Sequence, residues 1–244
     1  MPRANCSHNG KKTKNDFPRR DKYNYGAIFL QNQLPLYEKL DNLILENKVL
    51  KAFEELQKNI ISKKATKEDI IHFACQIRYT ENKLYLEKLF RLAKKHNLFS
   101  VPLYGIMFNY FYNNCEHNVI IKIYERLDIY SQKDLGITCI YLNALRKLKQ
   151  YHKAIKFLNI LTETNYMIEN QIGLDEYFCL LIIKAYCLKD YENENRERIY
   201  LNESFDLFKY ILKNINKKHD KYTWALCGFV FCINENLQRR TSFA

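Results

Sequence analysis

The segment NVIIKIYERL, residues 118–127, decides the fold because three other segments match it at a fixed distance along the chain. These are LKAFEEL (50–56), LYLEKLF (84–90) and KAIKFLNIL (153–161), and all four align without gaps. Two positions in each copy, four residues apart, recur every 34 residues: Ala52 with Leu56, Leu86 with Phe90, Ile120 with Tyr124, and Ala154 with Leu158. Side chains four residues apart lie on one face of a helix, so the repeat predicts equivalent amphipathic helices. A fifth copy, with Ser204 and Phe208, follows the fourth by 50 residues and therefore implies an insertion.

A second apolar-periodic stretch precedes each copy, for example at residues 70–77 and 104–111. Each unit is therefore predicted to be two helices of about 12 residues joined by a short polar turn. One such hairpin cannot cover both of its apolar faces, but stacked neighbours can. The sequence predicts an all-α solenoid of about five 34-residue helical hairpins.

The composition agrees with this fold class. The chain has 244 residues, of which 47% are hydrophobic, so it can bury a substantial core. Only 6 Gly and 4 Pro are present, and β-proteins use these residues in their many turns. No run approaches the ~18 apolar residues that a membrane-spanning helix needs, so no membrane span is expected.

The repeat divides the chain into three parts. Residues 1–32 are polar and basic and are predicted to be a disordered segment, with an organelle presequence and a nucleic-acid-binding arm as the alternatives. Residues 236–244 are predicted to be a tail. The repeat domain covers residues 33–235, with units near 33–66, 67–100, 101–134, 135–168 and 169–218, and the acidic insertion 190–203 is predicted to form a loop or an extended helix end. A partial unit at 219–235 resembles a first helix without its partner. It suggests a missing continuation, a truncated gene product or a protein docking on this uncapped helix.

The net charge of +12 favours a polyanion such as RNA, an acidic protein or an anionic surface as the partner. A bias of A/T-rich coding DNA towards Lys is the alternative explanation. Two groups of cations are the candidate RNA-binding residues. The first group is Arg91, Lys94 and Lys95, and the second is Arg146, Lys147, Lys149 and Lys153.

The repeat resembles the pentatricopeptide repeat family, with the tetratricopeptide repeats as the close alternative. The resemblance covers residues 33–235 and is strongest at 101–127, where Tyr104 falls at the family's early aromatic position. Ile120, Tyr124 and Leu127 fall where the family has Ala, Phe and Met. The tetratricopeptide pattern of Trp, Gly, Tyr and Pro is poorly met, although 34 residues is the length of that repeat.

The resemblance implies a right-handed α-α superhelix that binds single-stranded RNA along its first helices, with about one base per hairpin. The base-facing positions that it implies are Tyr37, Ile71, Gly105 and Cys139. None of these is the Asn, Ser or Thr that base recognition requires in the family. The departure favours binding by shape or charge, or a structural role in a ribonucleoprotein particle. Lys147 falls at a position that often contacts a backbone phosphate.

No enzyme, cofactor or metal site is predicted. The eight Cys include no C-x-x-C pair and lie mostly in apolar runs, which indicates free thiols in a reducing compartment. No nucleotide-binding, nucleophile-elbow or zinc-protease motif occurs. Glu68, Asp69 and His72 place carboxylates and an imidazole on one helix face, a pattern that is usually a surface pair.

The resulting hypothesis is an RNA-binding pentatricopeptide-like protein in organellar RNA processing, stability or translation, and a close variant of it is a ribosome-associated component. The expected location is the mitochondrion, with another organelle or the cytoplasm as alternatives. The hypothesis from another class is a tetratricopeptide-like scaffold that mediates protein–protein interaction.

Overall fold

The computed structural model of the protein describes residues 34–78, 83–195 and 198–241, and in these ranges the fold is all-α. Helices follow one another along the whole described chain, and no strand occurs among the described residues. The helices are α1 (Leu34–Leu45), α2 (Val49–Ile61), α3 (Lys67–Ile77), α4 (Lys83–Lys95), α5 (Val101–Asn113), α6 (His117–Tyr124), α7 (Ile129–Gln132), α8 (Leu135–Lys147), α9 (Tyr151–Leu161), α10 (Thr164–Glu169), α11 (Leu174–Asn195), α12 (Arg198–Asn214) and α13 (Tyr222–Thr241).

Ten of these helices form five hairpins, in each of which a first helix packs against the second helix that follows it. The pairs are α1 with α2, α3 with α4, α5 with α6, α8 with α9, and α11 with α12. The two short helices α7 and α10 follow the second helices α6 and α9, and the repeat pattern did not predict them. Asp128 begins α7, where its carboxylate accepts a hydrogen bond of 2.9 Å from the Ser131 backbone N–H.

The positions that define the repeat are all buried. Ala52, Leu86, Ile120 and Ala154 are fully buried, as is Ser204 in the fifth copy. The larger side chains four residues later, from Leu56 to Phe208, are at most 5% exposed. The 34-residue spacing therefore marks the apolar faces of α2, α4, α6 and α9, and the fifth copy marks that of α12 after the insertion.

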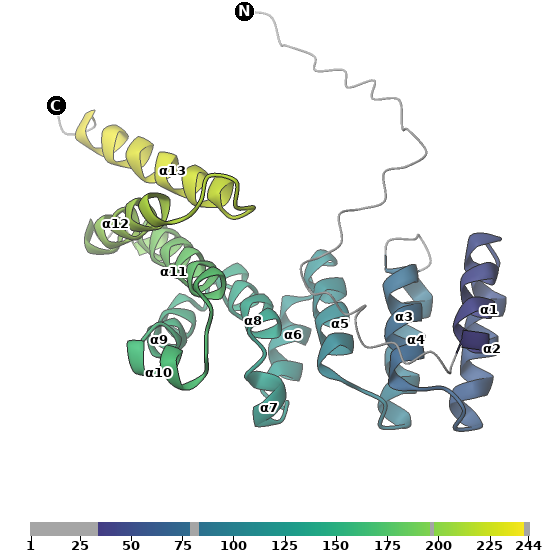
Figure 1. Ribbon diagram of the computed structural model, residues 1–244. Helices are drawn as coiled ribbons and strands as arrows, with labels where there is room; N and C mark the ends of the chain where they lie inside the picture. Colours follow the sequence, from purple (N-terminus) through teal and green to yellow (C-terminus); the bar gives the residue numbers. More distant parts are fainter. Residues whose placement is uncertain (1–33, 79–82, 196–197, 242–244) are drawn as a thin grey trace, which may run out of the picture.

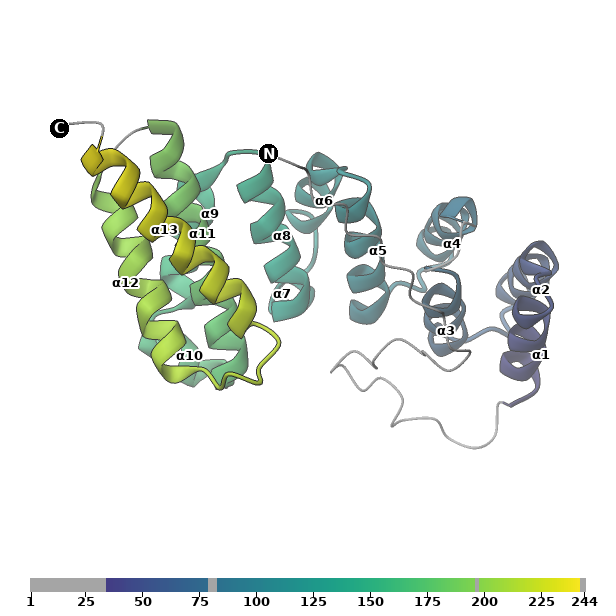
Figure 2. The ribbon, with the colours of Figure 1, turned by 90° about the horizontal axis from the view of Figure 1, so that it is seen from above.

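The first helices form a continuous row. Contacts join α1 to α3, α3 to α5, α5 to α8, α8 to α11 and α11 to α13. Among the second helices of the described ranges, packing is weaker than within this row, and it is clearest between α2 and α4. Seen from above, α1, α3 and α5 lie on one side of the row and α2, α4 and α6 on the other (Figure 2).

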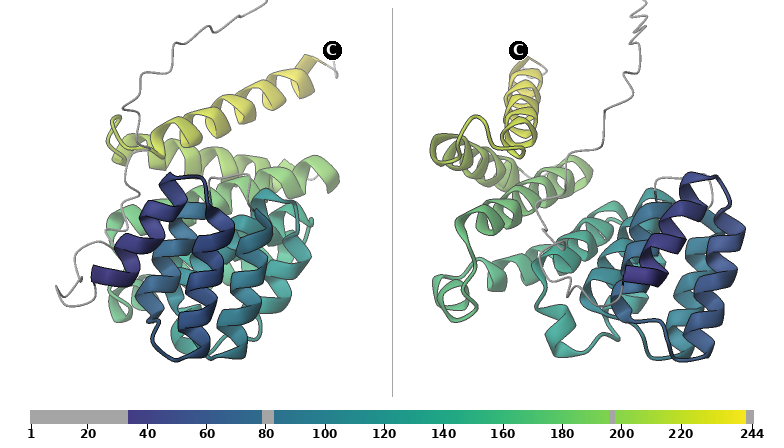
Figure 3. Two further views of the ribbon diagram at one scale, coloured as in Figure 1. Left: turned by 90° about the vertical axis from the view of Figure 1, so that its right-hand side faces the viewer. Right: turned by 45° about the vertical axis from the view of Figure 1, so that its right-hand side comes forward.

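The helix axes change direction along the row. Figure 1 shows α1 to α5 nearly upright, whereas α13 runs almost horizontally at the other end. Figure 3 shows α12 and α13 running crosswise to the earlier helices α1 to α4. The core follows this arrangement, because one cluster of buried apolar residues extends from α1 to α11 and a second joins α11, α12 and α13.

The insertion at 190–203 lengthens both helices of the fifth hairpin. Of the two predicted forms, a loop and an extended helix end, this is the second. The first helix continues to Asn195 and the second begins at Arg198. Glu192 is fully buried, and its carboxylate accepts a hydrogen bond from the Leu201 backbone N–H. This contact joins the last turns of α11 to the first turn of α12.

The two ends of the chain compare differently with the predicted boundaries. Residues 1–32 are outside the described residues. The last helix, α13, extends to Thr241, so residues 236–241 are helical although a tail was predicted from 236. Residues such as Leu237, Gln238 and Arg239 have good helix propensity, which explains why the helix continues. None of the helices in the described ranges combines the length and apolar character needed to cross a membrane.

Candidate nucleic-acid interface

The strongest concentration of positive charge lies on α4. This 13-residue helix carries five basic residues and a single acidic one, Glu87. By comparison, α11 carries two basic and five acidic residues over 22 positions. Lys94 and Lys95 lie in the last turn of α4, where cations are also favourable because the helix dipole is negative at its C-terminus.

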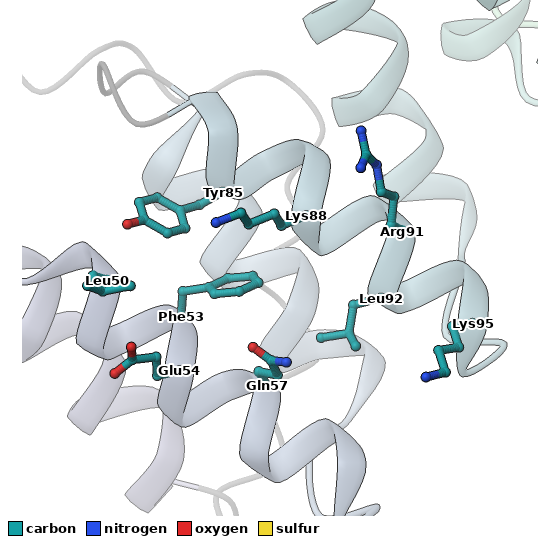
Figure 4. A pocket seen from close by; sticks show the side chains of 9 residues that line it. All are labelled: Leu50, Phe53, Glu54, Gln57, Tyr85, Lys88, Arg91, Leu92 and Lys95. Carbon is teal, nitrogen blue, oxygen red and sulfur yellow. The ribbon is translucent and has the colours of Figure 1, made fainter.

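A groove of about 510 Å³ lies between the second helices α2 and α4 (Figure 4). Its lining residues come from these two helices: Leu50, Phe53, Glu54, Gln57, Tyr85, Lys88, Arg91, Leu92 and Lys95. Phe53 is buried, and its ring centre lies 5.4 Å from that of Tyr85. The floor is thus aromatic and apolar.

One side of the groove is cationic. Lys88, Arg91 and Lys95 are spaced by three and four residues, so they follow one stripe of α4. The Lys88 ammonium lies 5.2 Å from the centre of the Tyr85 ring. Figure 4 shows Lys88 and Leu92 pointing towards α2, whereas Arg91 points away from the groove centre. Glu54 places one carboxylate on the α2 side, so the groove has a surplus of positive charge.

The cations of this stripe are largely open to solvent. Arg91 is 82% exposed, and its nearest carboxylate, Glu87, lies 3.7 Å away. Glu87 also accepts a hydrogen bond of 2.6 Å from the Tyr110 hydroxyl of α5. Burial, followed by this hydrogen bond, raises the pKa of Tyr110 to about 12, so the phenol stays protonated and joins α4 to α5.

The structure brings the first predicted cation group to this groove. Arg91 and Lys95 line it, and Lys94 is exposed on the same helix. The prediction missed Lys88 and Tyr85. Their spacing from Arg91 could have shown Lys88 on the same stripe, but the position of α2 opposite Tyr85 required the structure.

The second predicted group is largely neutralised within the fold. The Arg146 guanidinium lies 2.5 Å from Asp190, Lys149 lies 2.8 Å from Glu194, and Lys153 pairs with Glu125. Burial lowers the pKa of Arg146, but Asp190 outweighs it and the net shift is upward. Lys147 is exposed and has no ion pair among the described residues.

The base-facing positions implied by the resemblance present little polarity. Ile71, Gly105 and Cys139 lie on the first helices α3, α5 and α8 and are half-buried. A Cβ at Gly105 would meet open space. Burial raises the pKa of the Cys139 thiol to about 12, so the thiol remains neutral. Tyr37 lies in α1, but its side chain is outside the described residues.

Asp69 and His72 of α3 have structural partners, whereas Glu68 is exposed. Asp69 completes a capping box with Thr66, whose backbone N–H donates to Asp69 at 2.8 Å. His72 is buried and lies 2.6 Å from Asp41 of α1. No group of His, Cys, Asp and Glu in the described ranges is arranged to hold a metal ion.

Comparisons with known proteins add no relative: no family model matches the chain, and neither a curated protein nor a solved structure matches it.

Proposed function

We propose that this protein is a pentatricopeptide-like α-solenoid that binds single-stranded RNA through charge and base stacking and does not read a base sequence. The observation that carries the proposal is the α4 stripe of Lys88, Arg91 and Lys95 beside an aromatic floor. This site lies on the second helices α2 and α4, and so it differs from the surface of first helices that the resemblance implies. Cations that neutralise phosphates release counterions, and aromatic rings stack on bases of any kind. The apolar positions at Ile71, Gly105 and Cys139 support binding without a base code.

The fold side of the proposal is a right-handed superhelix of five hairpins. It is supported by the buried 34-residue register and by the row of first helices from α1 to α13. The proposed role in organellar RNA processing, stability or translation, and the mitochondrial location, rest on the resemblance and on residues 1–32. The location stays a prediction, to be checked by imaging the full chain in cells.

The test measures single-stranded RNA binding by the full chain over a range of salt concentrations. Replacing Lys88, Arg91 and Lys95 together by Gln should weaken binding. It should reduce the slope of log K against log salt by about 2, because each phosphate contact to a single strand contributes roughly 0.7. Tyr85→Leu should weaken binding by about fivefold or more, since one stacked base contributes about 1–3 kcal/mol.

The matched control replaces three exposed cations of another surface, Lys209, Lys213 and Lys217, by Gln. It removes the same net charge but should leave the salt slope nearly unchanged. Equal losses in the two triple variants would mean that net charge alone drives binding and would reject the α4 site. No retention of RNA by the wild-type chain at low salt would reject the RNA function.

A second candidate function, a scaffold for protein partners, is favoured by one observation. The helix α13 carries exposed apolar residues, among them Leu226 at 40% and Val230 at 46% exposure. Nanomolar binding of a peptide without any RNA retention would favour this function over the first.

A further inference from the structure

The helix α13 is firmly packed on one side. Ala225, Gly228 and Cys232 are buried at a spacing of three and four residues. Gly228 lies so close to α12 that a Cβ there would come within 2.3 Å of the Phe208 ring. The Phe229 ring stacks on Phe205 with centres 4.9 Å apart. This helix is therefore an integral part of the fold.

The face of α13 next to this packed side carries an apolar stripe, which consists of Tyr222, Leu226, Phe229, Val230 and Ile233. The spacing of four, seven, eight and eleven residues from Tyr222 places them on one helix face. Tyr222 and Phe229 form its packed edge, because both contact the buried cluster of α11, α12 and α13. Leu226 and Val230 are exposed and the other three are half-buried. Across its width, the stripe extends from Phe229, which contacts α12, to Val230, which faces solvent.

The repeat indicates what kind of element fits this stripe. Each of the five earlier first helices is covered by the second helix that follows it, antiparallel to it. The helix α13 contacts α11 and α12 as a first helix does, but no helix of the described ranges covers it as a second helix would. An amphipathic helix is thus the element that matches the geometry of the stripe.

The charges beside the stripe select an acidic occupant. Lys209 is exposed and lies four residues after Phe205 and three before Leu212, so it borders the surface that faces α13. Lys213, Lys217 and Lys218 are exposed between there and the start of α13, where Asp220 is the exposed carboxylate, so cations are in excess. A helix antiparallel to α13 would end near these cations. Both acidic side chains and the negative end of the helix dipole would be stabilised there.

We propose that the α13 stripe binds an amphipathic helix of a protein partner, antiparallel to α13 and acidic in its C-terminal half. The partner helix would take the place of the second helix of a sixth hairpin. This inference does not depend on RNA binding, because it uses none of the residues of the α4 stripe.

The probe is a labelled peptide with the sequence of α2, residues 49–61, whose apolar pattern is that of a second helix. The acidic peptide carries Gln57→Glu and Lys58→Glu, and its twin carries Gln57→Lys and retains Lys58. Fluorescence anisotropy with the full chain at low salt should show at least about tenfold tighter binding of the acidic peptide. This difference should shrink as salt screens the charges.

Substitutions on α13 test the stripe itself. Val230→Glu and Leu226→Glu each should weaken acidic-peptide binding by about tenfold or more. Both side chains are exposed, so the fold should persist, which circular dichroism can check. The control Trp224→Gln changes an exposed apolar residue on the opposite flank, two residues before Leu226, and should alter binding by less than twofold.

Three outcomes would overturn the proposal. The peptide twins could bind equally well, which would remove the acidic preference. Peptide binding could survive both Glu substitutions, which would place it elsewhere. Sedimentation could show a wild-type dimer that Val230→Glu converts to a monomer, in which case a second copy of the chain covers the stripe.

Discussion

At the scale of single residues, the ends of the helices are unusual because they use few glycines. Six residues other than Gly have φ between 52° and 61°, and each follows the end of a helix: Asn47, Lys63, Asn97, Cys115, Lys149 and Gln171. This left-handed conformation completes a helix C-terminus, where Gly is usually preferred because it has no Cβ. At Lys63 the following N–H, that of Lys64, bonds back to the Asn59 carbonyl at 2.8 Å.

Lys63→Gly should therefore stabilise the protein by about 0.5–1 kcal/mol. The left-handed conformation costs a residue with a Cβ about 1–2 kcal/mol, and the greater freedom of unfolded Gly offsets part of this. The control Lys51→Gly, at an exposed position inside α2, should destabilise by about 1 kcal/mol. Urea unfolding measures both, and destabilisation by Lys63→Gly would contradict the argument.

The buried His72 makes stability depend on pH. Burial lowers its pKa, and this effect exceeds the opposing effects of Asp41 at 2.6 Å and of Asp69. The folded protein therefore binds fewer protons at this site than the unfolded chain near the ordinary histidine pKa of about 6.5. Stability should fall as the pH drops through this range.

His72→Gln should reduce the loss of stability between pH 7.5 and 5.5. Burial also lowers the pKa of His117, so some dependence should remain in the variant. Thermal unfolding of both proteins at each pH measures the difference. An unchanged dependence in His72→Gln would show that Asp41 cancels the effect of burial, a steeper one would show that Asp41 outweighs it, and either would contradict the prediction.

At the scale of the helices, each second helix is anchored by its two repeat positions. In α9 these are Ala154 and Leu158, both fully buried, whereas Ile160 of the same helix is 44% exposed. A change to Ala at the buried repeat position Leu158 removes more buried apolar surface than the same change at the partly exposed Ile160.

Leu158→Ala should destabilise the protein by about 2–5 kcal/mol, because it removes transfer free energy and leaves a cavity. Ile160→Ala should cost well below half of that, because its side chain is already partly in water. Denaturant unfolding of the pair provides the comparison. Similar losses would mean that the 34-residue register does not define the core of α9.

Much of the helical pattern could be predicted from the sequence because helix burial has a local period. The positions of Leu56 and Phe208 follow from spacing alone, and both are fully buried. The site was less predictable, because it depends on contacts between distant segments. Arg146 and Asp190 are 44 positions apart, and only the packing of α8 against α11 brings them into an ion pair. The pairing of Phe53 with Tyr85 likewise required the approach of α2 to α4.

At the scale of the whole molecule, the two proposed surfaces lie at opposite ends. Figure 1 places α4 near one end of the row and α13 at the other. They also belong to different apolar clusters, since the cluster around Phe53 extends only as far as α11 and Phe208 belongs to the second. The proposed ligands also differ in kind, so the two sites should act separately.

The triple Gln variant of Lys88, Arg91 and Lys95 should therefore retain acidic-peptide binding within about twofold, and Val230→Glu should retain RNA binding to the same extent. Energetic coupling between sites needs an element with two arrangements that both ligands bias, and independent sites show additive free energies. Titrations of each ligand in the presence of the other measure the coupling. A change of tenfold or more in either affinity would contradict separate action.

The dominance of contacts between neighbouring hairpins has a consequence for biosynthesis. As the polypeptide leaves the ribosome, every new helix finds its packing surface in a segment that has already been made. Local contacts of this kind favour fast folding, and domains generally acquire structure from the N-terminal side first. A nascent chain of this protein would therefore expose one unpaired apolar face at a time, on the most recently folded hairpin. Chaperones would need to shield only that face.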